Sequence, residues 1–167
     1  MTLNSNYVLS AKLHQALNKK KLSLAFAESC TAGYISVDFT AVSGASNFLD
    51  FSIITYSNEA KIKHLGVDAD IIEQEGAVSA ACAQAMATGL QKLNPVDIAL
   101  SITGIAGPNG GSPEKPVGTV YLAIADRQLN TQYRHLFLKG GRKNIRRHSV
   151  QAAFEFLIQY IENNTFD

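Results

Sequence analysis

The sequence contains no tryptophan and only two cysteines among its 167 residues, and Asp, Glu, Lys and Arg make up only 17% of it. Because Cys30 and Cys82 form no CxxC pair and are too few for a disulfide framework, we expect reduced thiols in a cytoplasmic protein. Fifteen basic and fourteen acidic residues leave a formal net charge of +1, which provides no general field to hold a nucleic-acid backbone. No apolar run approaches the roughly 18 residues that span a bilayer, and the N-terminus has no signal pattern. We therefore expect a soluble protein that binds neither nucleic acid nor membrane.

Repeats, low-complexity tracts and Pro/Gly/Ser-rich linkers are also missing, so we expect residues 1–167 to form one domain. Hydrophobic residues make up 46% of the sequence, which is enough for a well-buried core. The four histidines are dispersed and no HExxH spacing occurs, so we expect no metal ion and no other cofactor.

Hydrophobic periodicity predicts helices that alternate with strands along most of the chain. Helices are expected at residues 9–17, 31–41, 58–65, 68–74, 80–93 and 142–161. Strands are expected at residues 22–27, 50–56, 97–103, 120–125 and 132–138, with the last two forming an antiparallel pair. This order predicts an α/β fold, a three-layer sandwich whose mixed parallel and antiparallel sheet carries helices on both faces.

Two predicted strands end in polar segments, where ligands bind in open α/β sheets. Residues 28–33 join a buried strand to a helix start, so their backbone amides are suited to an anion. The alternative is that Ser29 and Thr31 only cap the helix. In residues 56–61, Lys61 lies in the first turn of a helix, where the helix dipole disfavours its charged form. The alternative is an ordinary solvated lysine.

The third unusual segment is the loop from Gly104 to Gly118, which contains five glycines and three prolines. It is longer than a connection between two strands requires, which indicates a lid or a ligand cradle. It has neither the GxxxxGK[ST] nor the GxGxxG spacing, so the motif indicates neither ATP nor a dinucleotide.

A basic cluster begins the last predicted helix. Arg142, Lys143, Arg146 and Arg147 lie where positive charge is unfavourable, and a bound anion would relieve it. Arg142 and Arg146 are four residues apart and share a helix face, so a phosphate partner is our preferred interpretation. A solvated helix face is the alternative.

Four ordered motifs stand out when the chain is considered as a whole: AESCTAG at 27–33, TYSNEAK at 55–61, GAVS at 76–79, and SITGIAGPNGGS at 101–112 followed by KPVGTV at 115–120. Together they resemble the CinA C-terminal domain family over essentially the whole chain. The separate N-terminal domain of full-length CinA proteins has no counterpart here, so the chain resembles the stand-alone form. That family includes bacterial amidases that hydrolyse nicotinamide mononucleotide (NMN) to nicotinate mononucleotide and ammonia in the recycling of NAD.

The resemblance implies a serine amidohydrolase with a Ser/Lys dyad. Ser29 would be the nucleophile, Lys61 the general base and Tyr56 an assisting hydrogen-bond partner. Backbone amides of the turn from Cys30 to Gly33 would hold the oxyanion. The expected substrate-binding residues, from the motifs and from the basic cluster, are Cys30, Thr31, Gly33, Thr103, Gly104, Gly107, Arg142 and Arg146.

Two positions leave alternatives open. Ala32 stands where the family pattern has Gly, and a positive φ there would cost roughly 1 kcal/mol or more. The alternative function is therefore a non-catalytic nucleotide-binding paralogue that acts through a partner. Ser46 is a second candidate nucleophile. The apolar helix faces also permit a homodimer or a higher homo-oligomer.

Overall fold

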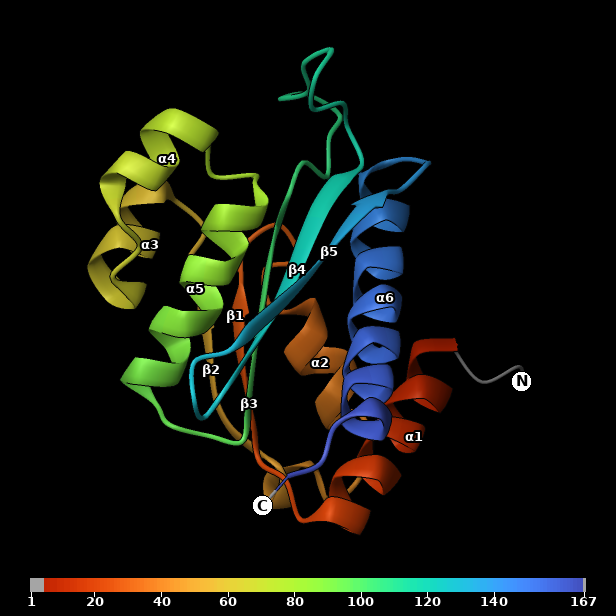
Figure 1. Cartoon of the computed structure of the whole chain (residues 1–167). Coiled ribbons are helices and arrows are strands. Elements are labelled where there is room, and N and C mark those ends of the chain that lie inside the picture. The colour runs from red at the N-terminus through yellow and green to blue at the C-terminus, as the bar shows by residue number, and fades with distance from the viewer. Residues whose placement is uncertain (1–4, 167) are drawn as a thin grey trace.

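Figure 1 shows the fold in a computed structural model of the chain, which describes residues 5–166. Its centre is a five-stranded sheet in the order β2-β1-β3-β4-β5. β1 pairs in parallel with β2 and β3, whereas β4 is antiparallel to both β3 and β5, so the predicted mixed sheet is confirmed. The strands are β1 (Leu24–Glu28), β2 (Leu49–Ile54), β3 (Ile98–Gly104), β4 (Thr119–Asp126) and β5 (Thr131–Phe137).

Helices cover both faces of the sheet, which confirms the predicted three layers (Figure 1). One face carries α1 (Ser5–Lys20), α2 (Tyr34–Thr40) and α6 (Arg142–Asn163). The other face carries α3 (Asn58–Leu65), α4 (Ala69–Glu75) and α5 (Ala80–Leu93). A short 3-10 helix, η1 (Ala45–Asn47), precedes β2. Within residues 5–166, no helix combines the length and the apolar character that crossing a bilayer requires.

The two faces of the sheet present side chains of different size, because alternate residues of a strand point in opposite directions. Toward α5, the fully buried apolar side chains of β1, β3 and β4 are small, namely Ala25, Ala27, Ala99, Ala123 and Ala125. The face toward α1, α2 and α6 presents large ones, namely Leu24, Phe26, Leu100, Leu122 and Ile124. The alanine face leaves room for the backbone of α5 to pack directly against β3 and β4.

The ends of the helices follow local signals in most places. Ser57 accepts a hydrogen bond from the third helical residue of α3, and Gly66 ends that helix with a φ of 62°. The predicted helix at 31–41 is wrong at its start, because Ala32 and Gly33 have φ values of 47° and 95° and a right-handed helix cannot include them. The helix therefore begins at residue 34.

The parallel pairing of β1, β2 and β3 brings their carboxyl ends to one edge of the sheet. Three segments that are distant in the sequence meet at this edge: the turn after β1, the connection from β2 to α3, and the loop that follows β3. The rest of the molecule thus serves to bring these three segments together.

Candidate functional site

Ser29 and Lys61 lie side by side at this edge. The Nζ atom of Lys61 donates a hydrogen bond to the Oγ atom of Ser29 over 3.1 Å. The same amine donates to the carbonyl oxygens of Thr55 at 2.9 Å and Tyr56 at 3.2 Å. These carbonyls, with that of Ser57 at 3.5 Å, hold the amine against the serine hydroxyl.

The surroundings of Lys61 disfavour its charged form. Its side chain is only 1% exposed, and burial lowers the pKa of the amine below its ordinary value. The negative charge of Glu59 opposes this shift only as a lesser effect. Within residues 5–166, no carboxylate forms an ion pair with the amine. Lys61 is therefore suited to accept a proton.

A cavity of about 270 Å³ opens onto this pair. It lies between the carboxyl ends of the strands, the start of α3, the segment before α5 and the loop after β3. Eight of the predicted site residues line it: Ser29, Cys30, Tyr56, Lys61, Thr103, Gly104, Gly107 and Arg142.

Arg142 connects the loop to the opposite wall of the cavity. Its Nη1 atom donates to the carbonyl of Gly107 at 2.9 Å, and its Nη2 atom donates to the hydroxyl of Tyr56 at 3.1 Å. Tyr56 therefore contacts Lys61 through its backbone carbonyl, whereas its hydroxyl faces Arg142. Tyr56 is thus a hydrogen-bond partner of Lys61 through its backbone and of Arg142 through its side chain.

Three predicted residues, Thr31, Gly33 and Arg146, are not among those that line the cavity. The Thr31 hydroxyl and the Gly33 N–H both donate to the carboxylate of Glu28. Arg146 donates to the Thr31 carbonyl at 2.6 Å, and its guanidinium lies 3.8 Å from the centre of the Tyr34 ring. The two arginines predicted to share a phosphate thus have different partners, because helical spacing fixes the Cα positions but not the ends of long side chains.

Two backbone amides next to Ser29 have no acceptor among the described residues. The Ala32 N–H donates to the Ser29 carbonyl, and the Gly33 N–H is used by Glu28. Within the part of the chain that the structure describes, the N–H groups of Cys30 and Thr31 donate to no other residue. These two amides remain from the oxyanion site that we expected between residues 30 and 33.

Ser46, the second candidate nucleophile, and the neighbouring Cys30 thiol are both less suited than Ser29. Burial raises the pKa of the Cys30 thiol to about 12, so the thiol stays protonated near neutral pH. Ser46 is exposed in η1, which precedes β2 and therefore lies at the amino ends of the parallel strands. The geometry favours Ser29, which has the lysine beside it.

Sequence reasoning missed several residues of the cavity wall, among them Asn58, Ala77, Val78 and Asn109. Residues 76–79 were recognised as a motif, but nothing in their chemistry indicated a role. In the structure the Ala77 carbonyl accepts a hydrogen bond from the Thr103 hydroxyl at 2.7 Å, which joins this segment to the end of β3. The match of residues 76–79 to a family motif is therefore the one sequence feature that indicates this part of the cavity wall.

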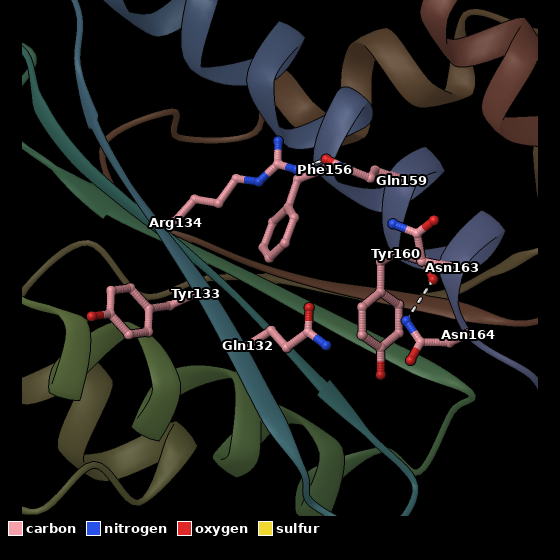
Figure 2. Close-up of a pocket in the computed structure, with 8 residues that line it drawn as sticks. All are labelled: Gln132, Tyr133, Arg134, Phe156, Gln159, Tyr160, Asn163 and Asn164. Atoms are coloured by element: carbon pink, nitrogen blue, oxygen red, sulfur yellow. Dashed lines mark hydrogen bonds between the residues drawn. The ribbon is translucent and has the colours of Figure 1, made fainter.

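A separate hollow of about 350 Å³ lies between β5 and the carboxyl-terminal half of α6, and Figure 2 shows its lining. There Arg134 donates to Gln159, and its guanidinium lies over the ring of Phe156. None of the predicted site residues lines this hollow. Within residues 5–166, no group of three or more His, Cys, Asp or Glu side chains is arranged to hold a metal ion.

Comparison with known proteins places this geometry in a family. The model of the CinA C-terminal domain matches residues 6–161. The chain belongs to the CinA C-terminal domain family. It is 48% identical over 155 residues to a CinA-like protein of Syntrophotalea carbinolica, covering 93% of this chain and 37% of that protein. A CinA-like protein of Dictyoglomus thermophilum is 48% identical over 141 residues, covering 84% of this chain and 34% of that protein. The chain thus spans about a third of the length of these curated relatives.

Solved structures of the CinA family have the same fold. The competence damage-inducible protein A (ComA) of Klebsiella pneumoniae superposes with a TM-score of 0.93 at 32% identity, covering 97% of this chain and 100% of that chain. The competence/damage inducible protein CihA of Agrobacterium tumefaciens superposes with a TM-score of 0.91 at 36% identity, covering 98% and 100%.

Proposed function

We propose that this protein is a serine amidohydrolase that hydrolyses the carboxamide of NMN to nicotinate mononucleotide and ammonia. The observation that carries the proposal is the 3.1 Å contact between Ser29 Oγ and the buried amine of Lys61, which opens onto a cavity. A serine hydroxyl is a weak nucleophile until an adjacent base takes its proton, and burial adapts this lysine to that task.

The first half of the proposed reaction forms an acyl-enzyme. Ser29 Oγ attacks the carboxamide carbon while neutral Lys61 takes the hydroxyl proton. The N–H groups of Cys30 and Thr31 stabilise the oxyanion that develops. The ammonium of Lys61 then gives its proton to the amide nitrogen, the carbon–nitrogen bond breaks and ammonia leaves. The Thr55 and Tyr56 carbonyls keep the amine oriented while it carries the proton.

The second half of the reaction releases the acid. Lys61, again neutral, takes a proton from a water molecule that attacks the acyl carbon. The ester bond to Ser29 breaks, its oxygen recovers the proton from Lys61, and nicotinate mononucleotide leaves. Arg142 is the one cationic side chain besides Lys61 in the cavity wall, and no carboxylate lines that wall. We assign Arg142 to the substrate phosphate on this basis.

Ammonia release from NMN tests this function. The wild type and Ser46→Ala should both produce ammonia and nicotinate mononucleotide. Ser29→Ala should be inactive. In Lys61→Ala the rate of ammonia release should fall by about 10²- to 10⁴-fold, the usual contribution of a general base. Full activity in Ser29→Ala would rule out the assigned nucleophile. Calorimetric binding of NMN without any product would instead favour the non-catalytic nucleotide-binding protein, for which Ala32 is the motivating departure from the family pattern.

A further inference from the structure

The carboxylate of Glu28 is completely buried beside the nucleophile and accepts five hydrogen bonds. Its Oε2 atom accepts the Thr31 hydroxyl at 2.7 Å, the Gly33 N–H at 2.9 Å and the Ile35 N–H at 3.2 Å. Its Oε1 atom accepts the Ser36 N–H at 3.0 Å and the Ser36 hydroxyl at 2.8 Å. Five donors converge on two oxygens, so the site suits a group that only accepts hydrogen bonds.

This arrangement decides which amides of the turn have an acceptor within the protein. Glu28 takes the N–H groups of Gly33, Ile35 and Ser36 at the start of α2, so this helix start offers none of them to a substrate. The N–H groups of Cys30 and Thr31 precede the helix and donate to no other described residue. Cys30 lines the cavity, whereas Thr31 comes directly after it in the chain and is buried. A buried carboxylate therefore separates the amides that hold the turn from those assigned to the oxyanion.

Glu28 also holds a strained residue. Ala32 has a φ of 47°, a left-handed conformation that places its Cβ too close to the backbone. The residues on either side of it, Thr31 and Gly33, both donate to the same oxygen of Glu28. From the outer side, Arg146 donates to the Thr31 carbonyl. The contacts on both sides keep Ala32 in a conformation that alanine does not favour.

We propose that Glu28 is the positioning residue of the nucleophile turn: it fixes residues 29–33, including the left-handed Ala32 and Gly33, in the geometry that directs Ser29 toward Lys61 and leaves the Cys30 and Thr31 amides to the oxyanion. This inference rests on the proposed role of Ser29. The side chain of Glu28 acts only through the turn, because no hydrogen bond links it to Ser29 or Lys61.

Glu28→Gln keeps the shape of the side chain but replaces one acceptor oxygen with an NH₂ group that faces N–H and O–H donors. The turn should then shift, and a displacement of about 1 Å at a reacting group costs about 100-fold in rate. We expect kcat for NMN to fall by this amount while KM changes little. The rate at which a fluorophosphonate labels Ser29 should fall in parallel, and this reagent reports the nucleophile without requiring amidase activity.

Ala32→Gly distinguishes positioning from general support of the fold. Glycine adopts positive φ without a steric cost, so its turn depends less on the carboxylate. The loss caused by Glu28→Gln should therefore be about fivefold smaller, or more, when Ala32→Gly is also present. This holds for kcat and for the labelling rate. If Glu28→Gln does not fold, Ser36→Ala removes one of the five bonds and should show a smaller loss with the same dependence on Ala32→Gly.

Asp97→Asn is the matched control. Asp97 accepts hydrogen bonds from Ser23 and Arg127 at the start of β3, the end of that strand that lies away from the cavity. Its substitution should lower stability and leave kcat and labelling unchanged.

Equal losses from Glu28→Gln with and without Ala32→Gly, or normal labelling in Glu28→Gln, would overturn the proposal. A wild type that is labelled at Ser29 but releases no ammonia would contradict the NMN function alone, whereas an unlabelled wild type would contradict both.

Discussion

At the scale of single residues, the amine of Lys61 is the group whose chemistry depends most on its surroundings. The sequence places it in the first turn of a helix, and the helix dipole there disfavours positive charge. The structure adds a stronger cause, because burial lowers the pKa of the amine. The sequence therefore predicted the direction of the effect, but the burial that produces most of it depends on tertiary packing.

The pH dependence of activity tests this state of Lys61. A general base acts only when it is unprotonated, so kcat/KM should rise with pH through a midpoint below the value of about 10.4 for an ordinary lysine. Between these two values the unfolded chain binds more protons than the folded one, so stability should also rise with pH in this window. Urea unfolding should show that rise in the wild type and a flatter dependence in Lys61→Met. An activity midpoint at or above about 10.4 would contradict a lowered pKa.

Arg142 allows a second test at this scale. If it holds the phosphate of NMN, Arg142→Ala should lower kcat/KM for NMN by about 10- to 150-fold, equivalent to about 1.5–3 kcal/mol for a charge-assisted hydrogen bond. Activity on the phosphate-free nicotinamide riboside should change much less. Arg146→Ala is the matched control, since Arg146 holds the Thr31 carbonyl and its loss should affect both substrates equally. Equal losses on both substrates in Arg142→Ala would remove the phosphate assignment.

At the scale of elements, close packing explains features that propensity does not. Gly89 lies inside α5, although glycine weakens a helix by about 1 kcal/mol relative to alanine. A Cβ atom at this position would lie 1.8 Å from the carbonyl oxygen of Leu65 at the end of α3. The glycine therefore allows α3 and α5 to pack closely beside the segment that carries Lys61.

Gly89→Ala should consequently destabilise the protein, despite the better helix propensity of alanine. We expect a loss of about 1–3 kcal/mol, the usual cost of overpacking, in urea unfolding. Thr88→Ala, at the neighbouring position of α5, should be neutral or slightly stabilising. A Gly89→Ala variant that is as stable as Thr88→Ala would show that the contact between the two helices relaxes easily.

The elements that the sequence predicted best are those whose ends depend on adjacent residues. The helix from Asn58 to Leu65 has the predicted bounds, because its cap Ser57 and its terminating Gly66 act locally. The start of α2 was misplaced by three residues, because the left-handed turn at Ala32 depends on bonds from its neighbours to a buried carboxylate. Alanine gives no sign of such a conformation in the sequence.

At the scale of the whole molecule, the parallel strands assemble the site from segments that are far apart in the chain. Ser29 follows β1, Lys61 lies in the helix after β2, Thr103 belongs to β3 and Arg142 begins α6. The α/β pattern predicted that strand ends would meet, and most of the predicted residues do line one cavity. The sequence did not predict that the guanidinium groups of Arg142 and Arg146 bond different partners. That outcome depends on which acceptors two long side chains reach.

The partitioning of a common intermediate tests the central claim, a covalent acyl-enzyme on Ser29. Hydroxylamine competes with water for an acyl-enzyme and converts it to the hydroxamate instead of the acid. NMN and the methyl ester of nicotinate mononucleotide carry the same acyl group and differ only in the group that leaves. The ratio of hydroxamate to acid should be the same for both substrates in the wild type, and Ser29→Ala should form neither product. Different ratios for the two substrates, or turnover that persists in Ser29→Ala, would contradict the account.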